Sequence, residues 1–316
     1  MTSPGRAEGP VESRAAGQVE VVRVEGRHVE GRHVEGRHVE GRHVEGKVAI
    51  VTGAGSTPGP GVGTGKATAI TLARAGARVL LVDLHPERAA ETLEIIEKDG
   101  GTAAVFAGDM TRSADAEAAV RAAVDTFGTL DILVNNIGAA IPGTVADTAE
   151  ADWDRALDIS LRTTFLVSKH AVRVMAAKGA GAIVNIGSIA AFRGTGHAGY
   201  SAAKGAVHAL TVDMAYAHGR QGIRVNAVAP GHITTPLLYS VLGETPETEF
   251  RRRLAAESTL LGTEGTAWDV AHAAVFLASD AARWITGVVL PVDGGATCVT
   301  PLLMAQHLRA VPAPEA

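Results

Sequence analysis

The 316-residue sequence predicts an α/β protein whose core is one parallel, doubly wound sheet. Three observations indicate this fold. Strand-like and helix-like segments alternate from residue 47 to residue 300, the strand-like segments are apolar runs typical of buried parallel strands, and a glycine-rich turn follows the first of them. No linker interrupts this stretch, so we expect one domain over 47–300, preceded by an arm (1–46) and followed by a tail (301–316).

The expected strands span residues 48–52, 77–82, 103–107, 131–135, 182–186, 223–228 and 288–292. The helices expected between them span residues 66–76, 87–98, 115–127, 153–178, 198–218 and 266–279. In such a fold, ligands bind at the carboxyl ends of the strands. The segment 237–261 follows the sixth strand, and we expect it to cover that edge as a lid.

The arm contains a repeat, because residues 24–43 are four copies of Val-Glu-Gly-Arg-His. A period of five fits neither a strand nor a helix, and each unit contains a glycine, so we expect disorder. The histidines His28, His33, His38 and His43 offer no preformed coordination geometry, so no metal site is expected.

Composition excludes several classes of function. The net charge of −5, without a basic stripe, argues against nucleic acid as a partner. No apolar stretch suits secretion or membrane insertion, and the single cysteine, Cys298, cannot form an intrachain disulfide. We therefore expect a soluble cytoplasmic protein without a membrane partner.

A glycine-rich turn joins the first expected strand to the first helix. Glycines let the backbone approach a pyrophosphate, and a helix N-terminus stabilises its charge. An apparent insertion at 57–62 leaves open which glycines contact phosphate: Gly63 and Gly65 are favoured by counting back from the helix, and Gly59 and Gly61 are alternatives. The candidates that close the strand are Thr52, Gly53, Gly55 and Ser56.

Asp83 ends the second expected strand. A carboxylate there can accept a hydrogen bond from a ribose 2′-hydroxyl and repel a 2′-phosphate, which favours NAD over NADP. The alternative is that Asp83 caps the helix containing Glu87.

Tyr200 and Lys204 stand four positions apart in an expected helix, so their side chains share one face. A cation near a phenol favours the phenolate, which can act as acid and base in alcohol–carbonyl chemistry. Such a pair also commonly just packs together.

With these residues, several motifs resemble the short-chain dehydrogenase/reductase family over about residues 45–297. They are Thr52-Gly53 with Gly63-x-Gly65, Gly108-Asp109-Met110, Asn135-Asn136-Ile-Gly138, Asn185-Ile-Gly-Ser188, Pro230-Gly231-His-Ile233-Thr-Thr235-Pro and Val292-Asp-Gly-Gly295.

The resemblance implies a Rossmann-type fold, a homotetramer assembled through the helices at 153–178 and 198–218, and defined site residues. Tyr200 would exchange the proton, Lys204 would lower its pKa and bind the nicotinamide ribose, and Ser188 would polarise the substrate oxygen. Other cofactor-binding residues implied are Asp109 and Met110 beside the adenine, Asn136 and Gly138 in the fourth-strand motif, and Pro230, Gly231, Ile233 and Thr235 in the turn that holds the carboxamide.

The chain departs from the family twice. The insertion at 57–62 is similar to the longer glycine loops of divergent enoyl-thioester reductases, whose Tyr and Lys are more widely spaced. The second departure is Ser160, which replaces the helix asparagine that helps hold a relay water as a fourth catalytic member. Serine is shorter, which puts the relay geometry in question, although a backbone carbonyl could still hold the water.

The sequence thus predicts an NAD-dependent oxidoreductase that interconverts a secondary alcohol and a ketone. The alternatives are an NADPH-preferring ketone or 3-oxoacyl-thioester reductase and a non-catalytic nucleotide-binding regulator. The apolar side chains of the lid suggest a hydrophobic or ring-bearing substrate. The arginines at 251–253 could meet an acidic substrate or form a solvated helix face.

Overall fold

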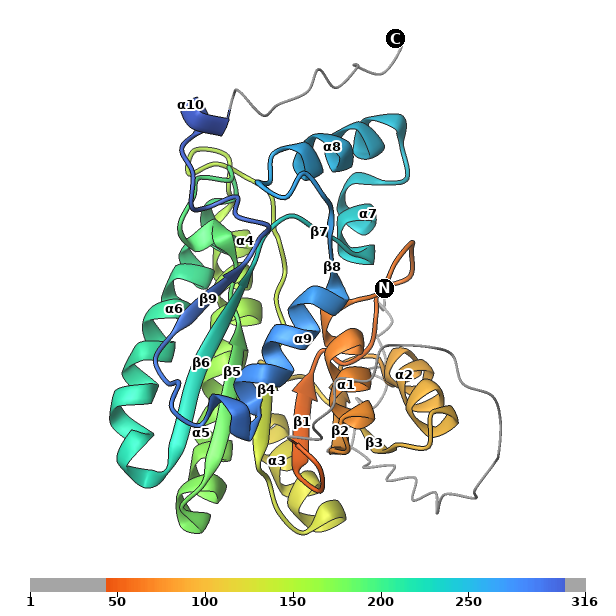
Figure 1. Cartoon of the computed structure of the whole chain (residues 1–316), viewed down its shortest axis with the longest axis vertical. Coiled ribbons are helices and arrows are strands. Elements are labelled where there is room, and N and C mark those ends of the chain that lie inside the picture. The colour runs from red at the N-terminus through yellow and green to blue at the C-terminus, as the bar shows by residue number, and fades with distance from the viewer. Residues whose placement is uncertain (1–43, 305–316) are drawn as a thin grey trace, which may run out of the picture.

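The computed structural model describes residues 44–304 and confirms the parallel, doubly wound sheet (Figure 1). Seven parallel strands lie in the order β3-β2-β1-β4-β5-β6-β9. Their bounds are Val48–Thr52 (β1), Arg78–Asp83 (β2), Thr102–Ala107 (β3), Ile132–Asn135 (β4), Gly181–Ile186 (β5), Ile223–Pro230 (β6) and Val289–Val292 (β9). The chain reverses its direction of winding between β1 and β4, and the carboxyl ends of these two strands form the crevice where such sheets bind ligands.

Helices cover both faces of the sheet (Figure 1). The helices are Thr64–Arg74 (α1), Pro86–Lys98 (α2), Ser113–Phe127 (α3), Glu150–Leu157 (α4), Thr163–Lys178 (α5), Ala198–His218 (α6), Pro236–Leu242 (α7), Pro246–Glu257 (α8), Ala267–Ala278 (α9) and Pro301–Met304 (α10). Apolar residues of α3, α5 and α6 pack on one face, and those of α1, α2 and α9 pack on the other. Burial on both faces explains why the strands read as continuous apolar runs. No helix among residues 44–304 is long and apolar enough to cross a bilayer.

The helix expected at 153–178 is divided in the structure. A π-helical turn, Asp158–Arg162, separates α4 from α5. Such a turn inserts one residue into the helical repeat and is often found at functional sites. Ser160 lies within this turn and is fully buried.

The expected lid contains α7 and α8, which lie above the carboxyl ends of the strands (Figure 1). A second sheet of two short strands, Ile233–Thr234 (β7) and Gly265–Thr266 (β8), closes the base of the lid. Two-residue strands carry no periodicity, so the sequence did not predict them.

The domain extends beyond both expected boundaries. Val44, from the truncated last repeat, is completely buried, and the Gly46 amide donates to the Gly76 carbonyl at 2.9 Å. Residues 44–46 therefore belong to the domain rather than to the arm. At the other end, α10 reaches Met304, whose side chain is buried. The complete repeats, with their four histidines, lie outside the described residues.

Candidate active site

Tyr200 and Lys204 lie on one face of α6, with the Lys204 ammonium 5.8 Å from the centre of the Tyr200 ring. The ammonium is buried and donates to the carbonyl oxygen of Ile186, at the end of β5, at 2.7 Å. Burial lowers the pKa of Lys204 to about 8, because water no longer solvates its charge. The pair therefore packs together at the carboxyl edge of the sheet.

The pKa of Tyr200 differs from the expectation. Burial raises the pKa of the phenol above its ordinary value, and a hydrogen bond with the Ser188 side chain lowers it by a smaller amount. The Lys204 ammonium donates to the Ile186 carbonyl, and burial has the larger effect on the pKa of the phenol. In this structure Tyr200 is thus a protonated phenol at neutral pH.

Ser188 follows β5 and caps a short 3₁₀ turn, Ile189–Ala191. Its hydroxyl oxygen accepts the Ala190 amide at 3.1 Å. The hydroxyl proton therefore remains available for the Tyr200 oxygen or for a substrate oxygen.

Ser160 lies behind Lys204, separated from it by Gly138. Its hydroxyl accepts the Ala139 amide at 3.3 Å, and its carbonyl accepts the Thr164 hydroxyl at 3.3 Å. A Cβ atom at Gly138 would lie 3.0 Å from the Lys204 nitrogen, so glycine allows the lysine to approach. The serine is thus bonded to the loop after β4, and its carbonyl already has one partner.

The glycine-rich turn is held by Asn136, whose side-chain amide donates to the carbonyls of Thr52 at 3.2 Å and Gly53 at 3.1 Å. The Asn136 backbone amide donates to the Thr52 hydroxyl at 3.0 Å. A Cβ atom at Gly65 would lie 1.9 Å from the Gly53 carbonyl, so only glycine lets the first turn of α1 approach the turn this closely.

The structure separates the candidate glycines into two groups. Gly63 is the N-cap residue of α1 and Gly65 lies in its first turn, where a helix N-terminus can bind an anion, while the Gly63 amide itself donates to the Ser56 hydroxyl at 3.0 Å. Gly59 and Gly61 instead lie against the lid: a Cβ atom at Gly59 would lie 3.6 Å from the Pro236 Cβ, and one at Gly61 would lie 3.7 Å from the Thr234 carbonyl oxygen. The insertion therefore connects the turn with the lid.

Asp83 ends β2 beside the same turn. Its carboxylate accepts the amides of Gly55 at 2.9 Å and His85 at 3.0 Å. His85 is the N-cap residue of α2 and makes no side-chain cap bond, so the Asp83 carboxylate, which accepts the His85 amide, also supports the start of this helix. Each carboxylate oxygen retains a lone pair with which it can accept a ribose hydroxyl.

Asp109 and Met110, which were expected beside the adenine, differ in their surroundings. Asp109 accepts the amide and the hydroxyl of Thr111, at 3.0 and 2.7 Å. The Met110 side chain is buried in the core beside α3, which leaves its backbone as the part that can border an adenine.

The turn that starts with Pro230 joins β6, the lid and the C-terminal motif. The Gly231 amide donates to the Val292 carbonyl at 2.9 Å. A Cβ atom at Gly231 would lie 2.6 Å from that of Asp293, so glycine is required there. Ile233 lies in β7 and Thr235 precedes α7, which places the turn at the entrance to the lid.

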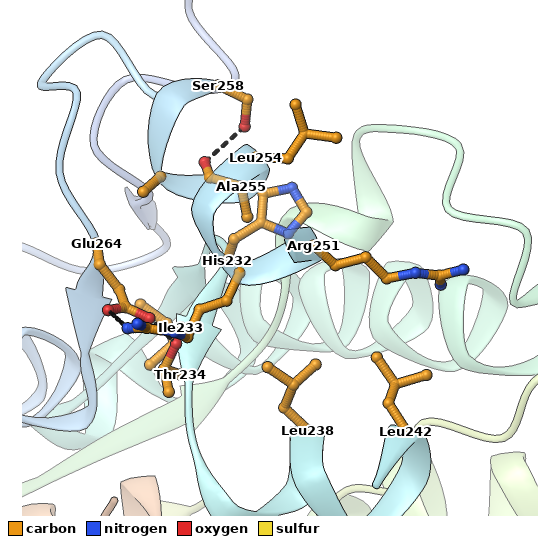
Figure 2. Close-up of a pocket in the computed structure, with 12 residues that line it drawn as sticks. His232, Ile233, Thr234, Leu238, Leu242, Arg251, Leu254, Ala255, Ser258 and Glu264 are labelled. Carbon is orange, nitrogen blue, oxygen red and sulfur yellow. Dashed lines mark hydrogen bonds and ion pairs between the residues drawn. The ribbon is translucent and has the colours of Figure 1, made fainter. Parts of the chain in front are cut away.

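A cavity of about 440 Å³ lies inside the lid (Figure 2). Leu238, Leu242 and Leu254 supply apolar walls, and His232, from the turn after β6, also lines the cavity. Ser188, Tyr200 and Lys204 do not line this cavity.

Two of the lid arginines are paired. Arg251 donates to Glu247 at 2.8 Å, and Arg252 binds Glu249 and Glu264. Both also line the lid cavity, so the segment 251–253 combines ion pairs of a helix face with part of the cavity wall.

His208, which was not among the expected site residues, lies one turn beyond Lys204 on α6. Its imidazole is buried against the segment that contains Ser188. The four-residue spacing of Tyr200 and Lys204 continues to this residue and could have indicated it.

A doubly wound sheet with a glycine turn at its switch point and a Ser–Tyr–Lys set beside it defines a dinucleotide-dependent oxidoreductase acting on CH–OH groups. A family profile described as enoyl-(acyl carrier protein) reductase matches residues 61–297. With this match and the relatives below, the chain belongs to the short-chain dehydrogenase/reductase family.

Several relatives are named as dehydrogenases. The chain is 41% identical to 2-(S)-hydroxypropyl-CoM dehydrogenase 3 of Xanthobacter autotrophicus over 76% of its length and 95% of that protein. It is 38% identical to cyclohexanol dehydrogenase of an Acinetobacter species, over 79% of this chain and 95% of the other. Among solved structures, 7α-hydroxysteroid dehydrogenase complexed with NADH and 7-oxo glycochenodeoxycholic acid is 36% identical, with a TM-score of 0.74, covering 82% of this chain and 97% of that one.

Proposed function

We propose that the protein is an NAD-dependent dehydrogenase that interconverts a hydrophobic secondary alcohol and its ketone. The observation that carries this proposal is the arrangement of Ser188, Tyr200 and Lys204 at the carboxyl edge of the sheet, beside the turn that Asp83 supports. A dinucleotide fits here because Gly65 lets α1 approach the turn, and the helix N-terminus can bind its phosphates.

The proposed reaction divides the work between these residues. The nicotinamide, when bound, supplies or accepts the hydride. In the reduction, Tyr200 gives its proton to the carbonyl oxygen, and in the oxidation it removes the proton of the hydroxyl. Ser188 donates to the same oxygen and stabilises the negative charge that develops there.

Lys204 has a different part in this proposal. One of its three N–H groups bonds to Ile186, which leaves two for the hydroxyls of the nicotinamide ribose. It therefore holds the cofactor close to Tyr200, and its charge is desolvated before the reaction begins.

We infer a preference for NAD from Asp83, because its carboxylate would repel the 2′-phosphate of NADP. Arg88 favours the NADP alternative, because its Cβ atom lies 2.5 Å from where a Cβ of Gly55 would be, so this arginine also borders the turn. Calorimetry with both nucleotides distinguishes the two readings. We expect NAD to bind much more tightly, and equal affinities would overturn the preference.

A matched pair of variants tests the contribution of Asp83. Asp83→Ala should weaken NAD binding and narrow the difference from NADP, because the ribose acceptor, the repulsion and the support of Gly55 disappear together. Asp83→Asn retains an acceptor for the Gly55 amide but loses the charge. It should therefore also narrow the difference between the NAD and NADP affinities, with a smaller loss of NAD affinity than in Asp83→Ala.

The lid and the relatives support a proposal for the substrate class. The cavity in the lid has mainly apolar walls, and two relatives are named for cyclohexanol and for cis-4-hydroxycyclohexanecarboxylate. We therefore propose a cyclic or otherwise hydrophobic alcohol. A screen of secondary alcohols and ketones with both nucleotides, followed at the nicotinamide absorbance, tests the proposal, and turnover confined to small polar alcohols would contradict it.

We also propose a cytoplasmic homotetramer. Exposed apolar side chains on α4, α5 and α6 supply its interface, namely Trp153, Phe165, Val212 and Tyr216. Sedimentation velocity should show a tetramer that Phe165→Glu dissociates, and a wild-type monomer would refute this assembly.

A further inference from the structure

His208 completes a row of three side chains on α6. Tyr200, Lys204 and His208 follow one another at intervals of four, so they lie on successive turns of one helix face. The imidazole is buried, and its Nε2 atom accepts the backbone amide of Ser188 in a long hydrogen bond of 3.4 Å. Since a backbone N–H can only donate, the ring is neutral and carries its proton on Nδ1.

The segment around Ser188 encloses the imidazole. A Cβ atom at Gly187 would lie 2.2 Å from Nε2, so glycine is what allows the ring to approach the strand end. On the other side, the Phe192 ring contacts the imidazole, with 4.9 Å between ring centres and an angle of 40°. His208 therefore contacts the chain before Ser188, at Ser188 and after it.

This contact matters because Ser188 lies where β5 has ended. The last sheet-like bond there joins the Gly187 amide to the Val228 carbonyl at 2.7 Å, and the next regular element is a short 3₁₀ turn. The Ser188 amide is buried, and without the imidazole it would lose its partner, which displaces the backbone or leaves a buried donor unsatisfied. Either outcome changes the direction of the Ser188 hydroxyl.

We propose that His208 is a positioning residue for the reaction, which holds the backbone of Ser188 so that its hydroxyl meets the phenol oxygen of Tyr200 and the oxygen of the substrate. The inference rests on the proposed function, because it acts through Ser188.

The surroundings keep the His208 imidazole neutral, which is the form whose Nε2 atom can accept the Ser188 amide. Burial, together with the charge of Lys204 one turn away on α6, lowers the pKa of His208 to about 4, and burial has the larger effect. The groups that face it from the β5 side are the Ser188 amide and the Phe192 ring, which carry no charge. Protonation would put two donors opposite each other, so acid should disrupt this contact and lower activity.

The first test compares His208→Ala with His208→Gln. Misplacing a reacting group by even a fraction of an ångström has large kinetic effects, so we expect kcat of His208→Ala to fall between about 10-fold and 100-fold. NADH affinity, measured by fluorescence, should be unchanged. His208→Gln should recover most of kcat, because its amide oxygen can accept the Ser188 amide.

A double-mutant cycle shows whether His208 acts through Ser188. In a Ser188→Ala background, His208→Ala should cause little further loss of kcat, because the hydroxyl that it positions has gone. A purely structural role would add its full effect in both backgrounds and would lower the melting temperature in parallel.

Gly187 provides an independent variant that leaves His208 in place. Gly187→Ala should displace the imidazole and reproduce the loss of His208→Ala, and the two changes together should not be worse than one. Gly194→Ala is the matched control, since a Cβ atom there has no heavy atom within 4 Å, and it should have wild-type kcat.

Two results would overturn the inference: wild-type kcat in His208→Ala, or a loss that His208→Gln does not restore and that is additive with Ser188→Ala. Tyr200→Phe separates this failure from failure of the proposed function. If Tyr200→Phe retains turnover, the proposed function is wrong. If Tyr200→Phe is inactive while His208→Ala is fully active, only the role of His208 is wrong.

Discussion

The ammonium of Lys204 donates to the carbonyl oxygen of Ile186 at 2.7 Å, which links α6 to the end of β5. This bond holds a charged group inside the protein, where desolvation favours the neutral amine. Activity and stability therefore oppose each other at this residue: the cation is needed to bind a ribose, and its burial costs free energy in the folded state.

The first prediction concerns the cost of this burial. The pKa of Lys204 falls from 10.5 when unfolded to about 8 when folded, so between these values the unfolded chain binds more protons. The free energy of unfolding should therefore rise with pH from about 8 to about 10.5, and below pH 8 the full cost, about 3 kcal/mol, is present.

Lys204→Met removes the charge and keeps the length of the side chain. We expect a higher melting temperature at pH 7, less change in stability between pH 8 and 10.5, and no turnover. Calorimetric melting over this pH range is the measurement, and Lys169→Met, a surface lysine on α5, is the control. A lower melting temperature at pH 7 would mean that the bond to Ile186 outweighs the desolvation.

The second prediction concerns Tyr200. Because burial raises the pKa of its phenol, the acid form prevails at neutral pH. Reduction of a ketone uses this form, so its rate should be constant near neutral pH and fall in alkali. Oxidation of the alcohol needs the phenolate, so its rate should increase with pH.

Profiles of kcat/KM against pH in both directions measure this difference. Tyr200→Phe should lose roughly 100-fold to 10,000-fold in turnover in both directions and retain nucleotide affinity, because only the proton-transfer group is removed. An oxidation rate that is already maximal at pH 7 would show that the phenol titrates well below its ordinary value.

The third prediction concerns Ser160, where this chain departs from its family. The serine is fully buried and bonds to the Ala139 amide. In Ser160→Asn, the amide oxygen can accept the same N–H, and the amide nitrogen can hold a relay water. We expect a modest increase in turnover, together with a loss of stability of roughly 1 to 3 kcal/mol from overpacking.

Ser160→Ala is the companion variant. It leaves the Ala139 amide without its acceptor, so it should lower stability and should not raise turnover. A tenfold or larger fall in turnover of Ser160→Asn, about 1.4 kcal/mol of barrier, would show that the surroundings are adapted to serine.

Local patterns were sufficient to predict most of the fold. The helix expected at 198–218 has those bounds in the structure, and each expected strand lies within two residues of an observed one. These segments are regular over their full length and bury one face or two, so periodicity reports them. The π turn around Ser160 is different, because its bonding is not expressed in a periodic pattern.

Relations between distant residues could not be predicted in this way. The four-residue spacing placed Tyr200 beside Lys204, but the direction of the Tyr200 pKa depends on burial and on the hydrogen bond with Ser188. Likewise, Val44 follows the same pattern in the sequence as the valines of the repeat, and its contact with the core is known only from the structure. The role of the inserted glycines is a third case, because only the fold brings them to the lid.

The last prediction tests this contact of the insertion with the lid. A Cβ atom at Gly59 would lie 3.6 Å from that of Pro236, within the range that a disulfide spans. The double variant Gly59→Cys/Pro236→Cys, with Cys298→Ser to remove the native thiol, should therefore form a disulfide on oxidation. If the lid must open for product to leave, the oxidised form should turn over slowly and recover when reduced.

The controls separate the disulfide from the substitutions. Gly59 has a φ of 137°, which a cysteine adopts with strain, so the reduced double variant should melt somewhat lower than the wild type while it still turns over. Gly100→Cys/Pro236→Cys is the matched control, because Gly100 also has a positive φ but lies at the end of α2, with no heavy atom within 4 Å of a Cβ there. This pair should remain as free thiols under the same oxidation. Free thiols in the Gly59 pair would show that the insertion does not rest on the lid, and rapid turnover of its oxidised form would show that the lid opens elsewhere.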